Sequence, residues 1–198
     1  MHRIAIAAAT IALAAVPAWP QGDSTPPGWF KAGRNPDDYD VGVDRAVKHG
    51  GNASAFVKSR SPNAAGFGTL MQRIAAQQWL GKRVRLAGYL RTDKVEKSGV
   101  LWMRIDGQDR THPLGFDNMQ DRGLHGTVDW VRVQIVLDVP RDAVDINFGI
   151  MLSGAGQVWA DDLSLEVVTT KTPTTGTGPR VPSRPLNLDF ERPRERES

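Results

Sequence analysis

Between residues 128 and 168 the sequence contains three runs in which apolar and polar residues alternate with a period of two. Strands with one face in a core and the other in water have this pattern, because successive side chains point to opposite faces. Turn-forming residues at 140–142 and 153–156 separate the runs. The apolar positions are Val131, Val133, Ile135, Leu137 and Val139, then Ile146, Phe148, Ile150 and Leu152, then Trp159, Leu163, Leu165 and Val167. The segment therefore predicts antiparallel strands with one buried face.

Shorter runs earlier in the chain extend this prediction. Strands are expected at 38–44, 54–59, 67–74, 82–92, 100–106 and 114–116, with a long polar loop at 117–127. Eight or nine short strands at near-regular spacing indicate an all-β fold, an antiparallel two-sheet β-sandwich (jelly roll). We expect this domain to cover residues 26–168.

The two ends of the chain differ from the domain between them. A short basic start is followed by an apolar run at 4–16, and Val16 and Ala18 occupy suitable −3 and −1 cleavage positions. Residues 1–18 therefore predict a secretory signal peptide, too short to span a bilayer, and a secreted or periplasmic product. Residues 169–184 are rich in Thr, Pro and Gly, as in a linker, and 192–198 are expected to be disordered. The chain has no cysteine, so it has no disulfide framework.

The charge balance argues against nucleic acid as a partner. Between residues 19 and 168 there are 18 Lys and Arg against 18 Asp and Glu, so the basic pI comes from the ends. A nucleic-acid-binding domain needs a clustered basic face. The only basic cluster places Arg83, Arg85 and Arg91 on one strand face. That face is either a solvated strand surface or a local anion site.

The order of four segments resembles a known family. The segments are PPGWF…YDVGVD, GKRVRLAGYLRT, VDWVRVQIVLDVP and GQVWADDLSLEVV. Together, over about residues 29–168, they resemble jelly-roll carbohydrate-binding modules with a galactose-binding-like fold. The resemblance implies a sandwich and suggests sugar binding, although one fold hosts many functions.

One feature of that family is displaced in this chain. Such modules open with a strand that reads N-x-x-F-E, which is missing before residue 26, whereas Asn187–Glu191 reads NLDFE after the linker. A sandwich without its opening strand would leave an edge uncovered. We therefore expect residues 185–191 to fold back as a strand, with a free tail or donation to another molecule as alternatives.

Candidate ligand-binding residues lie opposite the apolar positions of two strands. Trp102, Arg104 and Asp106 alternate with Leu101, Met103 and Ile105, and Trp130 and Gln134 alternate with Val131 and Val133. Aromatic rings flanked by Arg, Asp and Gln suit the apolar face and polar rim of sugars. The alternative for both tryptophans is packing within the sandwich. If they bind, we expect both to lie on one concave sheet.

A metal site is also suggested near the end of the domain. The alternation of the last strand places Asp161 inward with Trp159 and Leu163. A buried carboxylate needs a partner, which a calcium ion, an arginine or backbone amides would supply. The resemblance implies a structural calcium between this acidic pair and the Glu of the opening strand, hence Asp161, Asp189 and Glu191 as ligands.

No catalytic signature stands out. The histidines after residue 18 (His49, His112 and His125) lie in turns or loops, and no serine has a nucleophile-elbow context. Asp106 and Asp117 are acids of the type that glycosidases use, but 18 acidic residues make some such pair inevitable. We therefore expect no enzyme. The prediction is an exported, non-catalytic binding module for a glycan or envelope polysaccharide. The alternatives are a protein-interaction or envelope adaptor domain, and a glycoside hydrolase.

Overall fold

The computed structural model describes residues 25–176. Within them the chain forms nine strands and two short 3-10 helices. The strands are β1 (Phe30–Gly33), β2 (Tyr39–Asp44), β3 (Ser54–Ser59), β4 (Phe67–Ala75), β5 (Arg83–Asp106), β6 (Gly115–Asp117), β7 (Leu124–Asp138), β8 (Asp145–Ser153) and β9 (Gln157–Val168), and the helices are η1 (Pro36–Asp38) and η2 (Gln77–Trp79).

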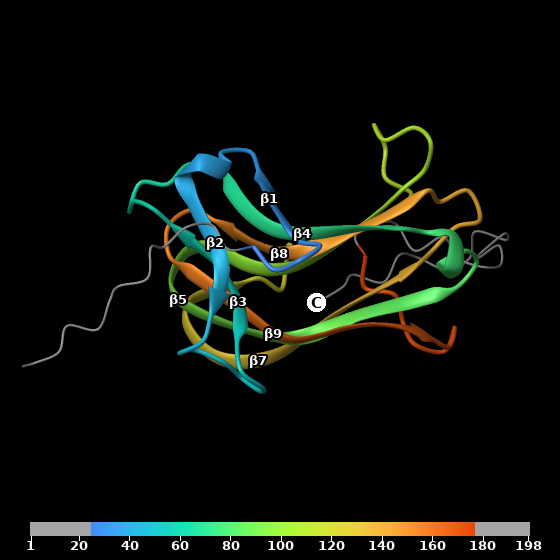
Figure 1. Cartoon of the computed structure of the whole chain (residues 1–198). Helices are drawn as coiled ribbons and strands as arrows, with labels where there is room; N and C mark the ends of the chain where they lie inside the picture. Colours follow the sequence, from blue (N-terminus) through green and yellow to red (C-terminus); the bar gives the residue numbers. More distant parts are fainter. Residues whose placement is uncertain (1–24, 177–198) are drawn as a thin grey trace, which may run out of the picture.

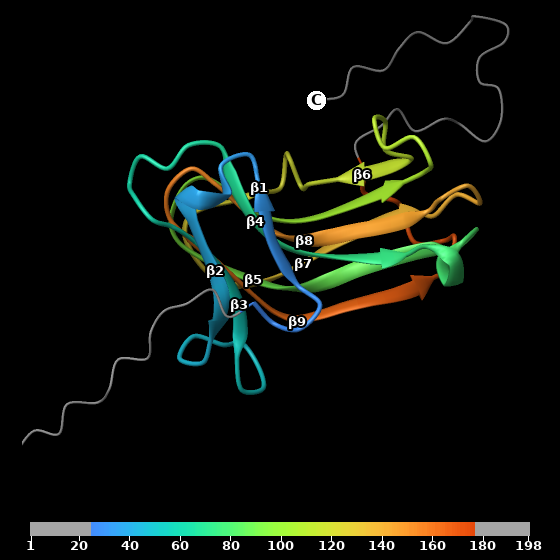
Figure 2. The ribbon, with the colours of Figure 1, turned by 45° about the horizontal axis from the view of Figure 1, so that its top comes forward.

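The strands form two layers packed face to face (Figure 1). The front sheet has the order β1-β4-β8-β5-β6, and the back sheet has the order β2-β3-β9-β5-β7, with all pairs antiparallel. Figure 2 brings the front sheet forward, with β6, β8 and β4 running alongside one another. The all-β, antiparallel sandwich predicted from the alternation is confirmed.

Strand β5 belongs to both sheets. Its first part, from Arg83 to Asp93, pairs with β9, and its second part, from Ser98 to Asp106, pairs with β8. The sequence predicted two separate strands here, which is wrong. The chain instead bends from one sheet to the other, with Lys94 in the left-handed region (φ 49°), and its hydrogen bonding continues through the bend.

The core lies between the two sheets and contains most apolar positions of the alternating runs. From the front sheet these include Leu70, Leu101, Met103, Ile105, Ile146, Ile150 and Leu152, and from the back sheet Val41, Val57, Val84, Leu86, Leu90, Ile135 and Val158. Val131 and Val167, predicted inward, are wrong, because they are 40% and 51% exposed. The predicted loop at 117–127 is shorter than expected, because β7 already begins at Leu124 and pairs with the bend of β5.

Strand β9 contains a bulge that reverses its alternation. Ala87 of β5 pairs with Ser164 and Tyr89 pairs with Asp161, so a step of two residues on β5 faces a step of three on β9. Asp162 supplies the extra residue, in the left-handed region with φ 52°. Before the bulge Val158 and Ala160 point into the core, and Trp159 and Asp161 therefore point outward. The predicted inward positions of Trp159 and Asp161 are wrong for this reason.

The start of the predicted linker lies against the sandwich. The Thr175 amide donates to the Val136 carbonyl (2.9 Å), the Val136 amide donates to Thr175 Oγ1 (2.8 Å), and Arg83 donates to the carbonyls of Thr170 and Thr172. The predicted signal peptide (1–18), the rest of the linker and residues 185–198 lie outside the described residues. In the part that is described, no helix has the length and apolar character needed to cross a bilayer.

The bulge predicts that glycine and alanine at position 162 differ in their effect on protein stability. An L-residue in the left-handed region is strained by about 1–2 kcal/mol, and glycine is not. We expect Asp162→Gly to be more stable than Asp162→Ala by about 1 kcal/mol in urea unfolding. Both variants lose the same carboxylate, so the comparison isolates the backbone.

Position 164 provides the matched control, because Ser164 lies on the same strand outside the left-handed region. There glycine should be the less stable variant, by about 0.5–1 kcal/mol. The same order of stability at both positions would contradict the bulge.

Candidate functional site

A groove of about 320 Å³ crosses the outer face of the front sheet. Every strand of that sheet, or the loop that follows it, contributes to its lining. The lining residues are Ala32, Gly33, Phe67, Thr69, Met71, Trp102, Arg104, Phe116, Asn118 and Met151. We call this feature the front groove. It combines apolar and aromatic walls with a few polar groups, as ligand pockets do.

The indole of Trp102 forms the floor of the front groove. Trp102 of β5 faces Gly149 of β8, yet its Nε1 donates to Thr69 Oγ1 on β4 at 2.8 Å. The indole therefore extends across β8, whose residue paired with Trp102 is Gly149. Thr69 in turn donates to the Ile150 carbonyl at 2.7 Å. Because Trp102 is only 9% exposed, it is a fixed floor and not a protruding platform.

Two buried carboxylates and an amide lie at one end of this floor. Asp106, Asn147 and Asp145, here called the acid–amide array, are each 4% exposed although they are on the outer face. Asn147 Nδ2 donates to Asp106 Oδ2 (2.9 Å) and to Asp145 Oδ1 (2.6 Å). Buried charge of this kind is tolerated only when it is paired and hydrogen-bonded.

Three arginines complete the array. Arg104 Nε donates to Asp106 Oδ1 (2.7 Å), Arg73 Nε donates to Asn147 Oδ1 (2.8 Å), and Arg110 Nη2 donates to Asp145 Oδ2. The Arg104 side chain is 34% exposed and that of Asp106 only 6%, so the arginine lies above the acid and faces the groove. The buried acid thus holds the Arg104 guanidinium in place.

The loop after β6 adds an unsatisfied acceptor. Asp117, fully buried, accepts from the Met119 amide (2.7 Å) and from Arg122 Nη2 (2.6 Å), and Met119 adopts a left-handed conformation with φ 54°. Between them lies Asn118, which lines the groove. Its Oδ1 is buried and has no hydrogen-bond partner among the described residues. Such groups are rare, and each calls for an explanation such as a bound ligand.

The structure brings only some of the predicted ligand-binding residues together. Trp102, Arg104 and Asp106 lie on one face of the front sheet, as the alternation predicted. Trp130 and Gln134 lie on β7, at the edge of the back sheet. The prediction that both tryptophans share one sheet is therefore wrong. Whether any of these residues contacts a ligand stays a prediction.

Trp130 and Asp161 take part in holding a loop to the back sheet. The His49 ring stacks on Tyr89 with ring centroids 3.7 Å apart and meets Trp130 edge-on at 5.7 Å. Asp161 Oδ2 accepts from the amides of His49 (2.8 Å) and Gly50 (3.1 Å), and Asp162 Oδ2 contacts His49 Nδ1 at 2.8 Å. The partner that Asp161 needs is thus provided by backbone amides.

This arrangement does not fit calcium binding by the described residues. The carboxylate of Asp161 already accepts three N–H groups, the third from Asp162. No group of three or more His, Asp or Glu side chains within residues 25–176 is placed to hold a metal. Asp189 and Glu191 lie outside the described residues, so the calcium site stays a prediction.

The basic cluster of the back sheet is paired across strands. Arg83 forms an ion pair with Asp138 (2.7 Å), Arg85 with Glu166 (2.8 Å), and Arg91 lies near Asp129 (3.9 Å) and over the Trp159 ring. These contacts describe a solvated strand face with its charges balanced.

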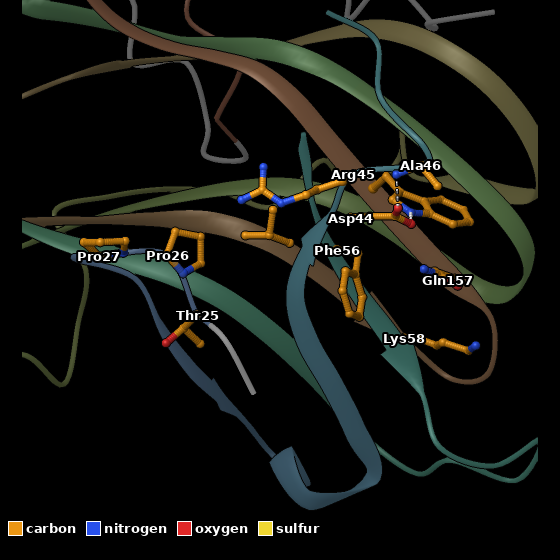
Figure 3. Close-up of a pocket in the computed structure, with 11 residues that line it drawn as sticks. Thr25, Pro26, Pro27, Asp44, Arg45, Ala46, Phe56, Lys58 and Gln157 are labelled. Atoms are coloured by element: carbon orange, nitrogen blue, oxygen red, sulfur yellow. Dashed lines mark hydrogen bonds between the residues drawn. The ribbon is translucent and has the colours of Figure 1, made fainter. Parts of the chain in front are cut away.

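A second hollow lies at the edge of the back sheet, between β2, β3 and the residues before β1. Figure 3 shows Phe56, Lys58 and Gln157 on its strand side and Thr25, Pro26 and Pro27 on another wall. Trp159, which also lines this hollow, is only 7% exposed. Its Nε1 donates a hydrogen bond to Asp44 at 2.9 Å. Arg45 and Lys58 are exposed and have no ion pair in the described part of the chain.

Of the ten residues that line the front groove, sequence reasoning named only Trp102 and Arg104. Thr69, Met71 and Met151 alternate with inward residues of β4 and β8, so their outward direction could have been predicted. Asn118 lies in a loop, where no periodic signal marks it.

Comparison with solved structures supports the fold. A family 22 carbohydrate-binding module, the xylan-binding domain CBM22-1 of Xyn10C from Paenibacillus barcinonensis, is similar with a TM-score of 0.51 and 13% identity, over 76% of this chain and 92% of that one. The enzymatically active domain of tailspike protein 4 from bacteriophage CBA120 is similar with a TM-score of 0.55 and 13% identity, over 72% of this chain and 20% of that one. The resemblance to the carbohydrate-binding-module fold is therefore confirmed.

Sequence comparison gives a different kind of relative. The chain is 40% identical over 169 residues to a Bacillus subtilis (strain 168) protein described as the uncharacterized HTH-type transcriptional regulator YbfP. The match covers 83% of this chain but only 56% of that protein, so the chain spans about half of its length. No family model matches the chain.

The second hollow generates a prediction about pH. Burial raises the pKa of Asp44, but hydrogen bonds from Trp159 and from the Val47 and Ala46 amides outweigh it and lower the pKa below its ordinary value. A carboxylate with a lowered folded-state pKa stabilises the protein above its unfolded pKa, and this contribution is lost as pH falls through the folded value. Asp44→Asn should therefore lower the unfolding free energy at pH 7 by about 1 kcal/mol, and the difference should shrink below about pH 4.

Urea unfolding at pH 7 and at acid pH measures this difference. Asp129→Asn is the control, because the Asp129 side chain is 87% exposed and 3.9 Å from Arg91. It should show no comparable pH-dependent change. A constant Asp44→Asn difference at all pH values would contradict the assignment.

Proposed function

We propose that this domain is a non-catalytic binding module for carbohydrate and that the front groove is its binding site. The observation that carries the proposal is the Trp102 floor, with Arg104 and Asn118 lining the same groove and the buried Asn118 Oδ1 without a partner among residues 25–176. A sugar ring has an apolar face that packs on such a floor and hydroxyls that donate to an acceptor such as Asn118. The xylan-binding neighbour of the same fold supports this class of ligand.

The carboxylates of the groove favour binding over hydrolysis. A glycosidase needs one carboxylic acid that donates a proton and a second carboxylate that acts as base or nucleophile, both facing the sugar. Asp106 lies beneath Arg104, and Asp117 is fully buried and held by Arg122 and the Met119 amide. These are the two acids that the sequence analysis named as glycosidase candidates, and neither faces the groove as a free group. The match to part of a regulator also fits a domain that binds a ligand without transforming it.

A binding survey tests the proposal. The purified full chain is applied to immobilised neutral and acidic plant and bacterial polysaccharides, and bound fractions are titrated. Saturable binding to at least one polysaccharide is expected. Absence of binding to all of them, together with a protein that co-purifies stoichiometrically, would instead favour the adaptor alternative.

Asn118→Ala should change binding and stability in opposite directions. The variant removes an unsatisfied buried acceptor, so the melting temperature should stay the same or rise. Loss of one ligand hydrogen bond should weaken glycan binding by about tenfold. Titration calorimetry and thermal unfolding of the same samples measure both quantities. Unchanged affinity would exclude Asn118 from the site.

We also propose that the protein is exported, on the basis of residues 1–18. The sequence predicts a mature chain that begins at Trp19. N-terminal sequencing of the protein recovered from a secreting host checks this. Recovery of the intact chain from the cytosol alone would contradict export.

A further inference from the structure

The arginines at one end of the front groove form a row across the sheet. Arg73 of β4 pairs in register with Asn147 of β8, which pairs with Arg104 of β5. Side chains at paired positions point to the same face, so the two guanidinium groups flank Asn147. Met71 and Trp102, which line the groove, occupy the adjacent row. The arginine row therefore closes one end of the Trp102 floor.

The carboxylate acceptors at this end each have a partner within the protein and are almost inaccessible, because the side chains of Asp106 and Asp145 are only 6% exposed. Both oxygens of Asp106 accept, one from Arg104 and one from Asn147, and both oxygens of Asp145 accept, one from Asn147 and one from Arg110. The Asn147 oxygen accepts from Arg73. A ligand that reaches this end thus meets no accessible acceptor of the acid–amide array.

Donors, in contrast, remain available. Arg73 uses Nε, and neither of its terminal nitrogens has a partner within residues 25–176. Arg104 uses Nε for Asp106 and Nη2 for the Arg110 carbonyl, which leaves Nη1 without a partner in the same part of the chain. The net formal charge of this end of the groove also favours an anionic ligand. Three arginines face two aspartates, which leaves a net charge of +1.

This imbalance distinguishes between classes of sugar. The hydroxyls of a neutral sugar act both as donors and as acceptors. Where the protein offers only donors, the hydroxyl O–H groups find no hydrogen-bond acceptor. A carboxylate is acceptor-only, and guanidinium groups bind it with short, charge-assisted hydrogen bonds. The array also fixes Arg104, so little side-chain freedom is lost when a ligand binds.

We propose that the front groove selects glycans that carry a carboxylate, such as uronic acid residues, with the carboxylate against Arg73 and Arg104 and the sugar ring over Trp102. This inference rests on the proposed carbohydrate-binding function and names its ligand class. The Asn118 oxygen, in the row of Trp102, accepts from a hydroxyl of the same ring.

The test uses ligand pairs that differ only in charge. Polygalacturonate is compared with its methyl ester, and glucuronoxylan with unsubstituted xylan, by affinity electrophoresis and calorimetry on the full chain. In at least one pair the acidic member should bind at least about tenfold more tightly, and the preference should decrease with added salt.

Matched arginine variants locate the effect. Arg73 is exposed, so Arg73→Gln should fold normally, and it should lower affinity for the acidic member by about tenfold with little change for the neutral one. Arg45→Gln removes the same charge from an exposed position in the hollow of Figure 3 and should leave both affinities unchanged.

Each outcome decides between the two proposals. Equal binding of both members of every pair, with Arg73→Gln silent, overturns the acidic selectivity and leaves the carbohydrate-binding function standing. Binding of no glycan overturns the function itself. An acidic preference lost in Arg45→Gln, or lost equally in both variants, overturns the assignment to the arginine row.

Discussion

Strand β5 is hydrogen-bonded in both sheets, and the position of Trp102 and Arg104 in the front groove follows from that constraint. Its first part has β9 on one side and β7 on the other, while its second part has β8 and β6. The hairpin between β8 and β9 crosses between the sheets alongside it, and the paired residues run from Asp106–Asp145 to Arg83–Val168. Because one continuous strand anchors both layers, Trp102 and Arg104 are fixed relative to the core by Leu101, Met103 and Ile105, each fully buried.

Alternation along a strand explains what could be predicted from the sequence. Within a regular strand it separates inward from outward residues, and it correctly placed Trp102, Arg104 and Asp106 on the face opposite the core. It says nothing about which sheet a strand joins, so Trp130 was wrongly grouped with Trp102. It also fails at a bulge: the extra residue at Asp162 moved Asp161 from a predicted core position to the outer face.

The remaining parts of the site depend on contacts between distant segments. Asn147 bridges two acids, one of which is 41 residues away in the sequence, and Trp102 reaches Thr69 across a strand whose residue at that point is glycine. An outward Asp in an alternating run indicates a solvated carboxylate, which is the commonest environment for such residues. That Asp106 and Asp145 are instead buried follows from the arginines and the amide that cover them, and no local pattern encodes this.

The two outer faces of the sandwich manage charge in opposite ways. On the back sheet Arg83 and Arg85 pair with exposed carboxylates on neighbouring strands, and pairs of this kind contribute little to stability and are screened by salt. On the front sheet the carboxylates are almost inaccessible, so each oxygen must be satisfied within the protein. This requirement orients the arginines, consumes the acceptors and leaves N–H groups directed at solvent. A face built in this way is rigid and has unused donors before any ligand arrives, whereas the paired face has its charges satisfied within itself. This physical asymmetry between the two sheets is the reason why we propose the front groove, and not the back sheet, as the site of ligand recognition.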